Sequence, residues 1–228
     1  MSTPRATPSR QSAAAARRKA REQQILAATR RLFDESGVRD AQIDDIARAV
    51  GINRAIIYRH FSGKEELFAL AVESYLEELR ERLEEAAAGA KGPTTEKLRA
   101  VVGAFVDYGI EYPAFVDCAQ TLMRRPGPEL LEQVSEGALF RLGRAITACL
   151  RTLKETLEEG TASGEFNVED SVLVANYMYA SGLGALQLAR IGLLVKESSP
   201  GIPSISRISG AQVRDFLTST AVALATGH

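Results

Sequence analysis

Two short apolar stripes separated by a glycine lie between residues 42 and 61, and they form the clearest hydrophobic pattern of the chain. In the first stripe the apolar side chains recur at i, i+3, i+4 and i+7, which predicts one face of a helix about two turns long. These residues are Ile43, Ile46, Ala47 and Val50. Gly51 follows them and can adopt the positive φ that a tight helix C-terminus requires. The pattern therefore predicts a helix that ends abruptly at Gly51.

The second stripe begins two residues later and predicts another helix, which runs to about Phe61. Asn53 is a good N-cap, and Ile57 and Phe61 fall on the buried face of this helix. The small side chain of Ala47 leaves room for two helices to cross at about 90–120° over so short a turn. We interpret residues 42–61 as a helix-turn-helix, the alternative being an ordinary helical hairpin inside an all-α protein.

The solvent side of the second helix carries side chains that suit DNA recognition. It presents cationic, small apolar and aromatic groups and no acidic residue, as expected of a helix that lies in a major groove. Arg54 is the strongest candidate for a base contact, because a guanidinium group can pair with guanine O6 and N7. Ala55 and Ile56 are candidates for contacts to thymine methyl groups, with inward packing as the alternative for Ile56.

Further residues of this region are expected at the DNA backbone. Tyr58, His60 and Lys64 are candidates for phosphate contacts, and Arg59 for a phosphate or a base. The full set of candidate DNA-binding residues is Gln42, Asn53, Arg54, Ala55, Ile56, Tyr58, Arg59, His60 and Lys64.

Four motifs in this region resemble the TetR-type (tetracycline-repressor-like) family of transcriptional regulators. They are IA at 46–47, VGI at 50–52, YRHF at 58–61 and GKEEL at 63–67. The resemblance covers about residues 23–79, and such a combination of motifs is seldom met by chance. The chain departs from the family pattern at four positions. The family usually has Thr where this chain has Gln42, Ser or Thr where it has Asn53, Gly where it has Ala55, and Thr where it has Ile56. Asn53 preserves the cap, so the fold carries over, whereas the operator sequence does not.

The resemblance implies an all-α protein with an N-terminal three-helix DNA-binding domain and a larger helical ligand-binding and dimerisation domain. It implies a homodimer that binds a pseudo-palindromic double-stranded DNA operator and responds to a small, largely apolar effector, most often as a repressor. The alternatives are a ligand-independent DNA-binding dimer and an activator. We place a disordered basic arm at residues 1–18, the helix-turn-helix domain at 19–66 and the second domain at 67–228. Whether the arm contacts DNA or is a solvated tail stays open.

The rest of the chain shows helical periodicity and no convincing strand pattern. Ser62 and Glu65 are expected to form a capping box at the start of the helix that leaves the DNA-binding unit. The sequence SSPGIPS at 198–204 predicts a turn-forming linker. The predicted helices cover about residues 20–37, 62–83, 94–111, 113–123, 128–159, 168–196 and 212–225.

Large side chains concentrate in the helices of the second domain. The family's second domain encloses a ligand cavity, so these side chains are candidates for its lining, with core packing as the alternative for each. The candidates are Phe105, Tyr108, Tyr112, Phe115, Leu122, Met123, Phe140, Tyr177 and Tyr179. The small residues of 180–185 allow another helix to approach closely, and this region, together with the last helix, resembles the dimer interface of the family; packing within one chain is the alternative.

The formal net charge of −1 conceals an asymmetry along the chain. Residues 1–64 contain 13 basic and 6 acidic side chains, a net of +7, and the remainder carries −8. The positive charge thus accompanies the helix-turn-helix, as phosphate binding requires.

The two cysteines, Cys118 and Cys149, have no CxxC spacing and are expected to be buried small hydrophobic residues. With one internal histidine, no nucleophile motif and no phosphate loop, we expect neither an enzyme nor a metal or cofactor site. No apolar run approaches the ~20 residues of a membrane span, so a cytoplasmic protein is expected.

Overall fold

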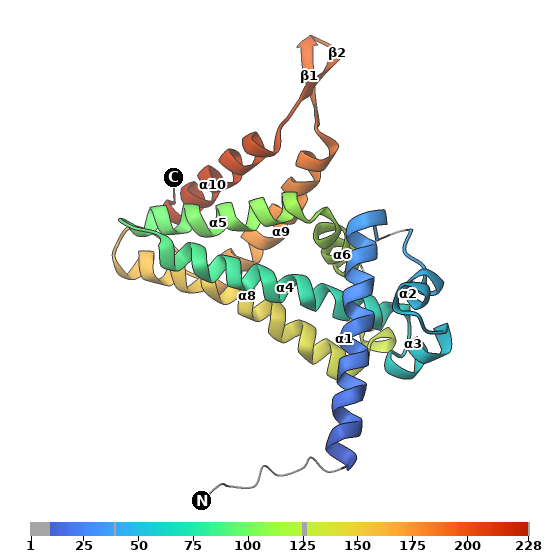
Figure 1. The fold of residues 1–228 in the computed structure, drawn as a ribbon. Helices are drawn as coiled ribbons and strands as arrows, with labels where there is room; N and C mark the ends of the chain where they lie inside the picture. Colours follow the sequence, from blue (N-terminus) through green and yellow to red (C-terminus); the bar gives the residue numbers. More distant parts are fainter. Residues whose placement is uncertain (1–9, 39, 125–126, 228) are drawn as a thin grey trace, which may run out of the picture.

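The described part of the chain folds into helices with one two-stranded hairpin near its C-terminal end, which confirms the predicted all-α fold class (Figure 1). The structure is a computed structural model, and it describes residues 10–38, 40–124 and 127–227. The elements are α1 (Arg10–Ser36), α2 (Ile43–Val50), α3 (Arg54–His60), α4 (Lys64–Gly89), α5 (Thr94–Glu111), α6 (Pro113–Met123), α7 (Gly127–Gln133), α8 (Glu136–Ala162), α9 (Ser171–Ile191), β1 (Leu193–Ser199), β2 (Ile202–Arg207) and α10 (Gly210–Thr226).

The first three helices form the predicted helix-turn-helix unit. Gly51 takes a φ of 71°, and the Ile52 amide donates to the carbonyl of Ala47 over 2.9 Å, which closes α2 as expected. Ile46 and Ile57 are fully buried, and Phe61 is almost so. The local spacing of apolar residues therefore predicted the helix-turn-helix correctly.

Helix α4 leaves this unit and continues through the second domain (Figure 1). It contacts α1 and α6 near the DNA-binding unit and α5 and α8 along the rest of its length. Tyr75, Leu76, Leu79 and Leu83 are buried along its inner face. Any displacement of α4 must therefore involve both halves of the molecule.

Two predicted helix boundaries in the middle of the chain were wrong. The N-cap of α4 is Gly63 and not Ser62, and the carboxylate of Glu66, not Glu65, accepts from the Ser62 amide over 2.5 Å. The helix predicted over 128–159 is divided into α7 and α8, because Ser135 caps α8 by accepting from the Ala138 amide over 3.3 Å. Serine is a good N-cap and a neutral helix-interior residue, so it favours the interruption.

The prediction of a helix to residue 196 was also wrong, whereas the turn predicted within residues 198–204 was confirmed. Gly192, with a φ of 68°, ends α9, and an antiparallel hairpin of β1 and β2 follows, with Val195 paired to Ile205. The segment Pro200–Gly201 is the turn of this hairpin. A glycine in the left-handed conformation terminates the helix, and the β-branched residues after it favour strands.

The first helix begins earlier than predicted. Helix α1 starts at Arg10 and runs through Arg18 without interruption, so residues 10–18 are helical and not part of a disordered arm. The rest of the predicted arm lies outside the described residues. Gly37, with a φ of 83°, lies just after the end of α1, as expected.

Candidate DNA-binding surface and apolar cleft

Helix α3 is held by one fully buried residue and one cap, and most of its other side chains lie toward solvent. The Asn53 side chain accepts from the Ile56 amide over 3.1 Å, as the N-cap prediction required. Ile57 is fully buried beneath the helix, whereas Arg54 and Arg59 are exposed and Tyr58 is half-exposed. The helix thus offers two guanidinium groups and a phenol on one accessible surface.

The other candidate DNA-binding residues surround α3 with different degrees of exposure. Gln42 precedes α2 and is exposed, while Ile56 is partly buried, so the alternative of inward packing applies to part of its side chain. The Nδ1 atom of His60 is enclosed and has no hydrogen-bond partner among the described residues. A DNA contact from His60 would therefore use its other ring nitrogen. The Lys64 ammonium lies 4.9 Å from the ring centroid of Phe68, at the start of α4.

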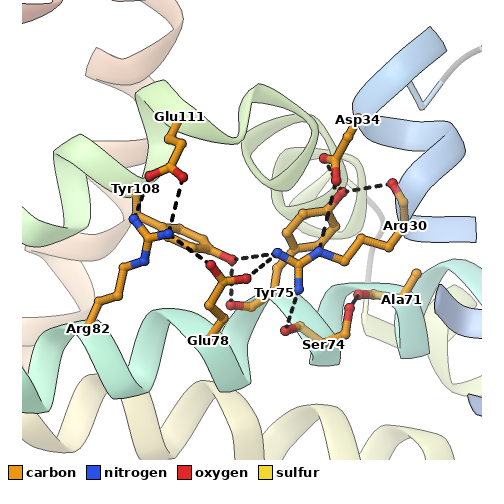
Figure 2. Close-up of polar contacts among 9 residues, drawn as sticks. All are labelled: Arg30, Asp34, Ala71, Ser74, Tyr75, Glu78, Arg82, Tyr108 and Glu111. Atoms are coloured by element: carbon orange, nitrogen blue, oxygen red, sulfur yellow. Dashed lines mark hydrogen bonds and ion pairs between the residues drawn. The ribbon is translucent and has the colours of Figure 1, made fainter.

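A network of polar side chains joins the DNA-binding unit to the second domain (Figure 2). Arg30 of α1 donates to the Ser74 carbonyl over 3.2 Å and to the Glu78 carboxylate, both on α4. Its guanidinium carbon lies 4.2 Å from the ring centroid of Tyr75, and it also donates to the hydroxyl of Tyr108 on α5 over 3.4 Å. One cation of α1 therefore binds both helices that carry the core of the second domain.

Two tyrosines extend this network. The Tyr75 hydroxyl donates to Asp34 of α1 over 2.6 Å, and the Tyr108 hydroxyl donates to the Tyr75 carbonyl over 3.0 Å. Burial raises the pKa of both tyrosines well above the usual range. The two hydroxyls consequently remain protonated donors at every physiological pH.

The acidic member of the network is stabilised in its charged form. Burial alone would raise the pKa of Glu78, but hydrogen bonds and positive charge from Arg30 and Arg82 outweigh burial and hold this pKa below its usual range. Arg82 donates to Glu78 over 2.9 Å and also pairs with Glu111 at the end of α5. Sequence reasoning missed this network, although charged residues between the apolar positions of α4 were an available signal.

A second set of polar contacts joins α8 to the DNA-binding unit. Glu66 accepts from the Ser62 amide and from the Ser135 hydroxyl at the N-cap of α8. Further along α8, the Arg141 guanidinium donates to Glu22 of α1 and to Glu73 of α4, each over 2.6 Å. Helices α1, α4 and α8 are thus connected by ion pairs as well as by packing.

An apolar cleft lies in the second domain between α4, α5, α8, α9 and α10. It contains about 690 Å³ of empty space, part of which is open to solvent. Tyr177, Ser181 and Thr220 are exposed lining residues and mark its open side on α9 and α10. Its lining is Leu79, Leu83, Val101, Val102, Phe105, Cys149, Leu150, Leu153, Tyr177, Met178, Tyr179, Ser181, Gly182, Leu217, Thr220, Ala221 and Leu224.

The structure brings only part of the predicted pocket lining to this cleft. Phe105, Tyr177 and Tyr179 line it. The other six candidates lie elsewhere, so the prediction that these side chains share one pocket needs correction. They are Tyr108, Tyr112, Phe115, Leu122, Met123 and Phe140.

These six residues lie elsewhere for different reasons. Tyr108 and Phe115 are fully buried and pack against each other, with ring centroids 5.5 Å apart. Tyr112 packs on Tyr108 at 4.8 Å beside the polar network, where core packing was the alternative for each of these rings. Leu122 is partly buried against the core, and Met123 and Phe140 are 55% and 67% exposed. Helical spacing does not distinguish the buried positions among these from cleft positions, because both lie on the apolar side of a helix.

The cysteines are buried as predicted, whereas the small residues of α9 differ from one another. Cys118 and Cys149 are buried, and burial raises the pKa of the Cys149 thiol to about 12, which makes it inert. Gly182 packs within the chain, because a side-chain carbon at this position would lie 2.8 Å from the Phe105 ring. Gly184, in contrast, is exposed and has no neighbour at that position.

Helices α9 and α10 expose large apolar side chains beside the cleft. Leu173 and Tyr177 of α9 are 66% and 59% exposed, and Phe216 of α10 is 67% exposed. Leu188 and Ile191 continue the exposed apolar positions to the end of α9. Several large exposed apolar side chains on two neighbouring helices are typical of a protein–protein interface.

Across residues 10–38, 40–124 and 127–227, no cluster of His, Cys, Asp and Glu side chains is arranged to hold a metal ion. In the same residues no helix is both long and apolar enough to cross a membrane.

The DNA-binding unit matches a known family. Residues 25–71 match the model of the family described as bacterial regulatory proteins, tetR family. The HTH-type transcriptional regulator BetI of Stenotrophomonas maltophilia (strain R551-3) is 30% identical over 124 residues, which are 53% of this chain and 63% of BetI. The matched segments span less than two thirds of the length of such curated relatives.

Solved structures share the architecture over most of the chain. The transcriptional regulator FadR from Bacillus subtilis, solved in complex with stearoyl-CoA, aligns with a TM-score of 0.63 and 19% identity over 90% of this chain and 98% of FadR. RolR in complex with resorcinol aligns with a TM-score of 0.66 and 17% identity over 92% of this chain and 90% of RolR. At these identities the likeness shows the common fold alone.

Proposed function

This chain belongs, through residues 25–71, to the tetR family of bacterial regulatory proteins, and from this premise we propose that it is a ligand-responsive repressor that binds a pseudo-palindromic operator as a homodimer. The observation that carries the proposal is α3, a helix capped by Asn53 and anchored by Ile57 that presents Arg54, Tyr58 and Arg59 to solvent. The relatives of this chain are regulators of transcription and not enzymes.

On the DNA side we assign different roles to the exposed side chains. Arg54, at the first turn of α3, reads a guanine in the major groove, and Ala55 contacts a thymine methyl group. Tyr58 and Lys64 bind phosphates, and Arg59 binds a phosphate or a base. The domain boundaries that we propose are residues 10–66 for the DNA-binding domain and 67–228 for the second domain, in a cytoplasmic protein.

We assign dimerisation to α9 and α10. Their exposed Leu173, Tyr177 and Phe216 and the exposed Gly184 give an apolar surface that a second copy can approach closely. Two helices from each subunit then form a four-helix bundle about a two-fold axis. The same axis relates two recognition helices, which fit half-sites about one helical turn apart.

We assign the effector to the apolar cleft. Its lining is almost wholly apolar, with the hydroxyls of Tyr177 and Tyr179 available as polar contacts, which suits a small and largely apolar molecule. Leu79 and Leu83 of α4 line the cleft, and α4 also carries the partners of Arg30 at the DNA-binding unit. An effector that prefers one position of α4 changes the spacing of the recognition helices, and a typical coupling is about 1–3 kcal/mol.

A DNA selection experiment tests the DNA-binding role. Duplexes selected from a randomised pool by the intact chain are expected to contain an inverted repeat. Arg54→Ala is expected to relax specificity at one base of each half-site, and Tyr58→Ala to weaken all sites alike. Arg48→Ala is a matched control, because Arg48 is exposed on α2 and pairs with Asp45. If the intact chain enriches no sequence, DNA recognition by α3 is refuted.

A thermal-shift screen separates the effector-responsive repressor from its alternatives. Apolar compounds that bind the cleft raise the melting temperature. The same compounds are expected not to raise the melting temperature of Ala221→Phe, because the added ring fills the cleft beside α10. A ligand-independent DNA-binding dimer would show no shift with any compound. An activator would show the shift but increase transcription from its operator in a reconstituted assay.

A further inference from the structure

The β1–β2 hairpin between α9 and α10 has an apolar face that nothing in the described part of the chain covers. In Figure 1 the hairpin projects beyond the ends of α9 and α10, away from the helix-turn-helix. Val195 and Ile205, which face each other across the two strands, are 79% and 71% exposed. We propose that this hairpin is a dimerisation arm whose apolar face packs on the second copy of the chain. The inference rests on the homodimer proposed above.

The alternation of residues along the strands creates the two faces. Leu193, Val195, Pro203 and Ile205 share one side of the hairpin with Glu197 near the turn and Arg207 near the base, as their pairing across the strands requires. The opposite side carries Lys196, Ser204 and Ser206, with Leu194 near the base. The centre of one face is therefore apolar, with a charged residue toward each end, and the other face is largely polar. Such a difference between faces is expected where a sheet is buried on one side only.

The hairpin is built as a defined arm. Its base is closed by a hydrogen bond from the Ile208 amide to the Gly192 carbonyl over 3.1 Å. At its tip Gly201 takes a φ of 78°, and its amide donates to the Glu197 carboxylate over 2.5 Å. The Ser198 hydroxyl donates to the Ile202 carbonyl over 3.1 Å. An isolated two-stranded hairpin is marginally stable in water, so its apolar face has a reason to be covered.

Continuity with the proposed dimer surface identifies the occupant as a second copy. Exposed apolar residues continue along the chain from Leu188 and Ile191 at the end of α9 to Leu193 and Val195 of β1. Because the hairpin leads out of α9 and back into α10, a partner that covers these two helices comes within reach of the arm. The same surface therefore extends from the helices onto the strands.

The contact is expected to use the face of the hairpin and not its edges. Lys196 lies in β1 and Pro203 in β2, and lysine and proline in edge strands oppose the addition of further strands. The arm thus avoids open-ended sheet association, while its apolar face remains free for a closed, symmetric contact.

Sedimentation equilibrium over a range of concentrations tests the arm. The double variant Val195→Ser with Ile205→Ser removes the apolar pair, and we expect its dimer dissociation constant to rise about tenfold or more. The matched control, Lys196→Ser with Ser204→Ala, changes the opposite face and is expected to stay within about twofold of the unmodified chain. Circular dichroism establishes that both variants keep the helical content.

The outcomes separate the arm from the dimer. A dimer whose dissociation constant is the same in both variants and the unmodified chain overturns the arm while the proposed dimer stands. An unmodified chain that is monomeric at all concentrations overturns the proposed dimer and the arm together. A dimer that is weakened by the Val195/Ile205 variant but not by the Lys196/Ser204 control supports both the arm and the proposed dimer.

Photo-crosslinking provides a second readout, which reports the proximity of the hairpin to the partner and not the dimer dissociation constant. A photoreactive phenylalanine replaces Val195 in chains labelled with ¹⁴N and in chains labelled with ¹⁵N. The two samples are mixed in equal amounts, and their subunits are allowed to exchange before irradiation. Crosslinked peptides that combine both labels are expected between the hairpin and the partner's α9, α10 or hairpin. Crosslinks confined to peptides of a single label, in a sample shown to be dimeric and exchanged, overturn the arm.

Discussion

The recognition helix and the α9–α10 surface expose opposite kinds of side chain. At α3 the large apolar residue Ile57 is fully buried, and the exposed groups are arginines and a tyrosine. At α9 and α10 the large apolar residues Tyr177 and Phe216 are themselves exposed, at 59% and 67%. One surface is complete in a single chain and suits a charged, hydrated partner. The other surface exposes apolar residues of the kind usually found in a protein core. It therefore suits an apolar partner, such as a second copy of the chain or an apolar effector.

The region between these two surfaces differs from both. Arg30 and Glu78 are mostly buried side chains that pair with each other, and Tyr75 and Tyr108 add hydrogen bonds around them. Such a contact has strict geometric requirements, whereas apolar packing tolerates small shifts. We therefore expect the relative position of α1 and α4 to take a few discrete values, a property that a switch needs.

The largest effect is expected from the residue that anchors α3. Ile57→Ala removes a fully buried side chain and should lower the free energy of unfolding by about 2–5 kcal/mol. DNA binding should weaken with it, because α3 loses its support. Urea denaturation measures the loss. Leu131→Ala, at a position 68% exposed on α7, is the control and should change stability by less than about 0.5 kcal/mol. Equal losses in the two variants would contradict the burial of α3.

The next largest effect concerns the apolar surface. Phe216→Ser should weaken dimerisation by about 1.5–3 kcal/mol, because the dimer loses the apolar area of the ring from its interface. Folding of the single chain should change little, since the ring is 67% exposed. Sedimentation equilibrium measures the dimer, and Ser219→Ala on the same helix serves as control. A variant that dimerises normally would show that this face of α10 is not an interface.

The junction should give a pH-dependent effect of intermediate size. Since the pKa of Glu78 is held below the ordinary value of 4.5, its contribution to stability is complete above that pH and is lost as the pH falls through the lowered pKa. Glu78→Gln should cost about 1–2 kcal/mol at neutral pH, between the values for exposed and buried ion pairs.

Thermal melts from pH 7 to pH 3 measure this difference. The melting temperatures of the original chain and of Glu78→Gln should converge at the acidic end. Glu77→Gln, one residue away and exposed, should follow the original chain throughout. A constant difference between Glu78→Gln and the original chain would show that the carboxylate does not contribute through its charge.

The smallest effect is expected at the cap of α3. Asn53→Ala removes the acceptor for the Ile56 amide and should cost about 1 kcal/mol, whereas Asn53→Asp should retain most of the stability. Chemical denaturation of the two variants gives the comparison. If Asn53→Asp loses as much stability as Asn53→Ala, the side chain of Asn53 does not act as a cap.

The sequence-based predictions were most accurate for features that depend on residues close together in the chain. The ends of α5 and α6 were predicted closely, because Thr94, Pro113 and the apolar spacing around them act within one or two helical turns. The break at Ser135 was also local, but its signal was weaker than the apolar periodicity around it. The turn at Gly201 lies within the segment predicted to form a turn. The placement of α3 side chains followed directly from the helical period.

The amino-acid sequence by itself determined the helix-turn-helix, its glycine turn and the exposed face of α3, because each depends on residues within a few positions of one another. Only the tertiary structure decided that Tyr108 packs beside Arg30 while Tyr179 lines the cleft. Both tyrosines lie on apolar stripes, and the stripe shows which side of a helix is buried but not which helices cover it. Those neighbours come from segments far apart in the chain, and their packing assigns one ring to a polar junction and the other to a cavity.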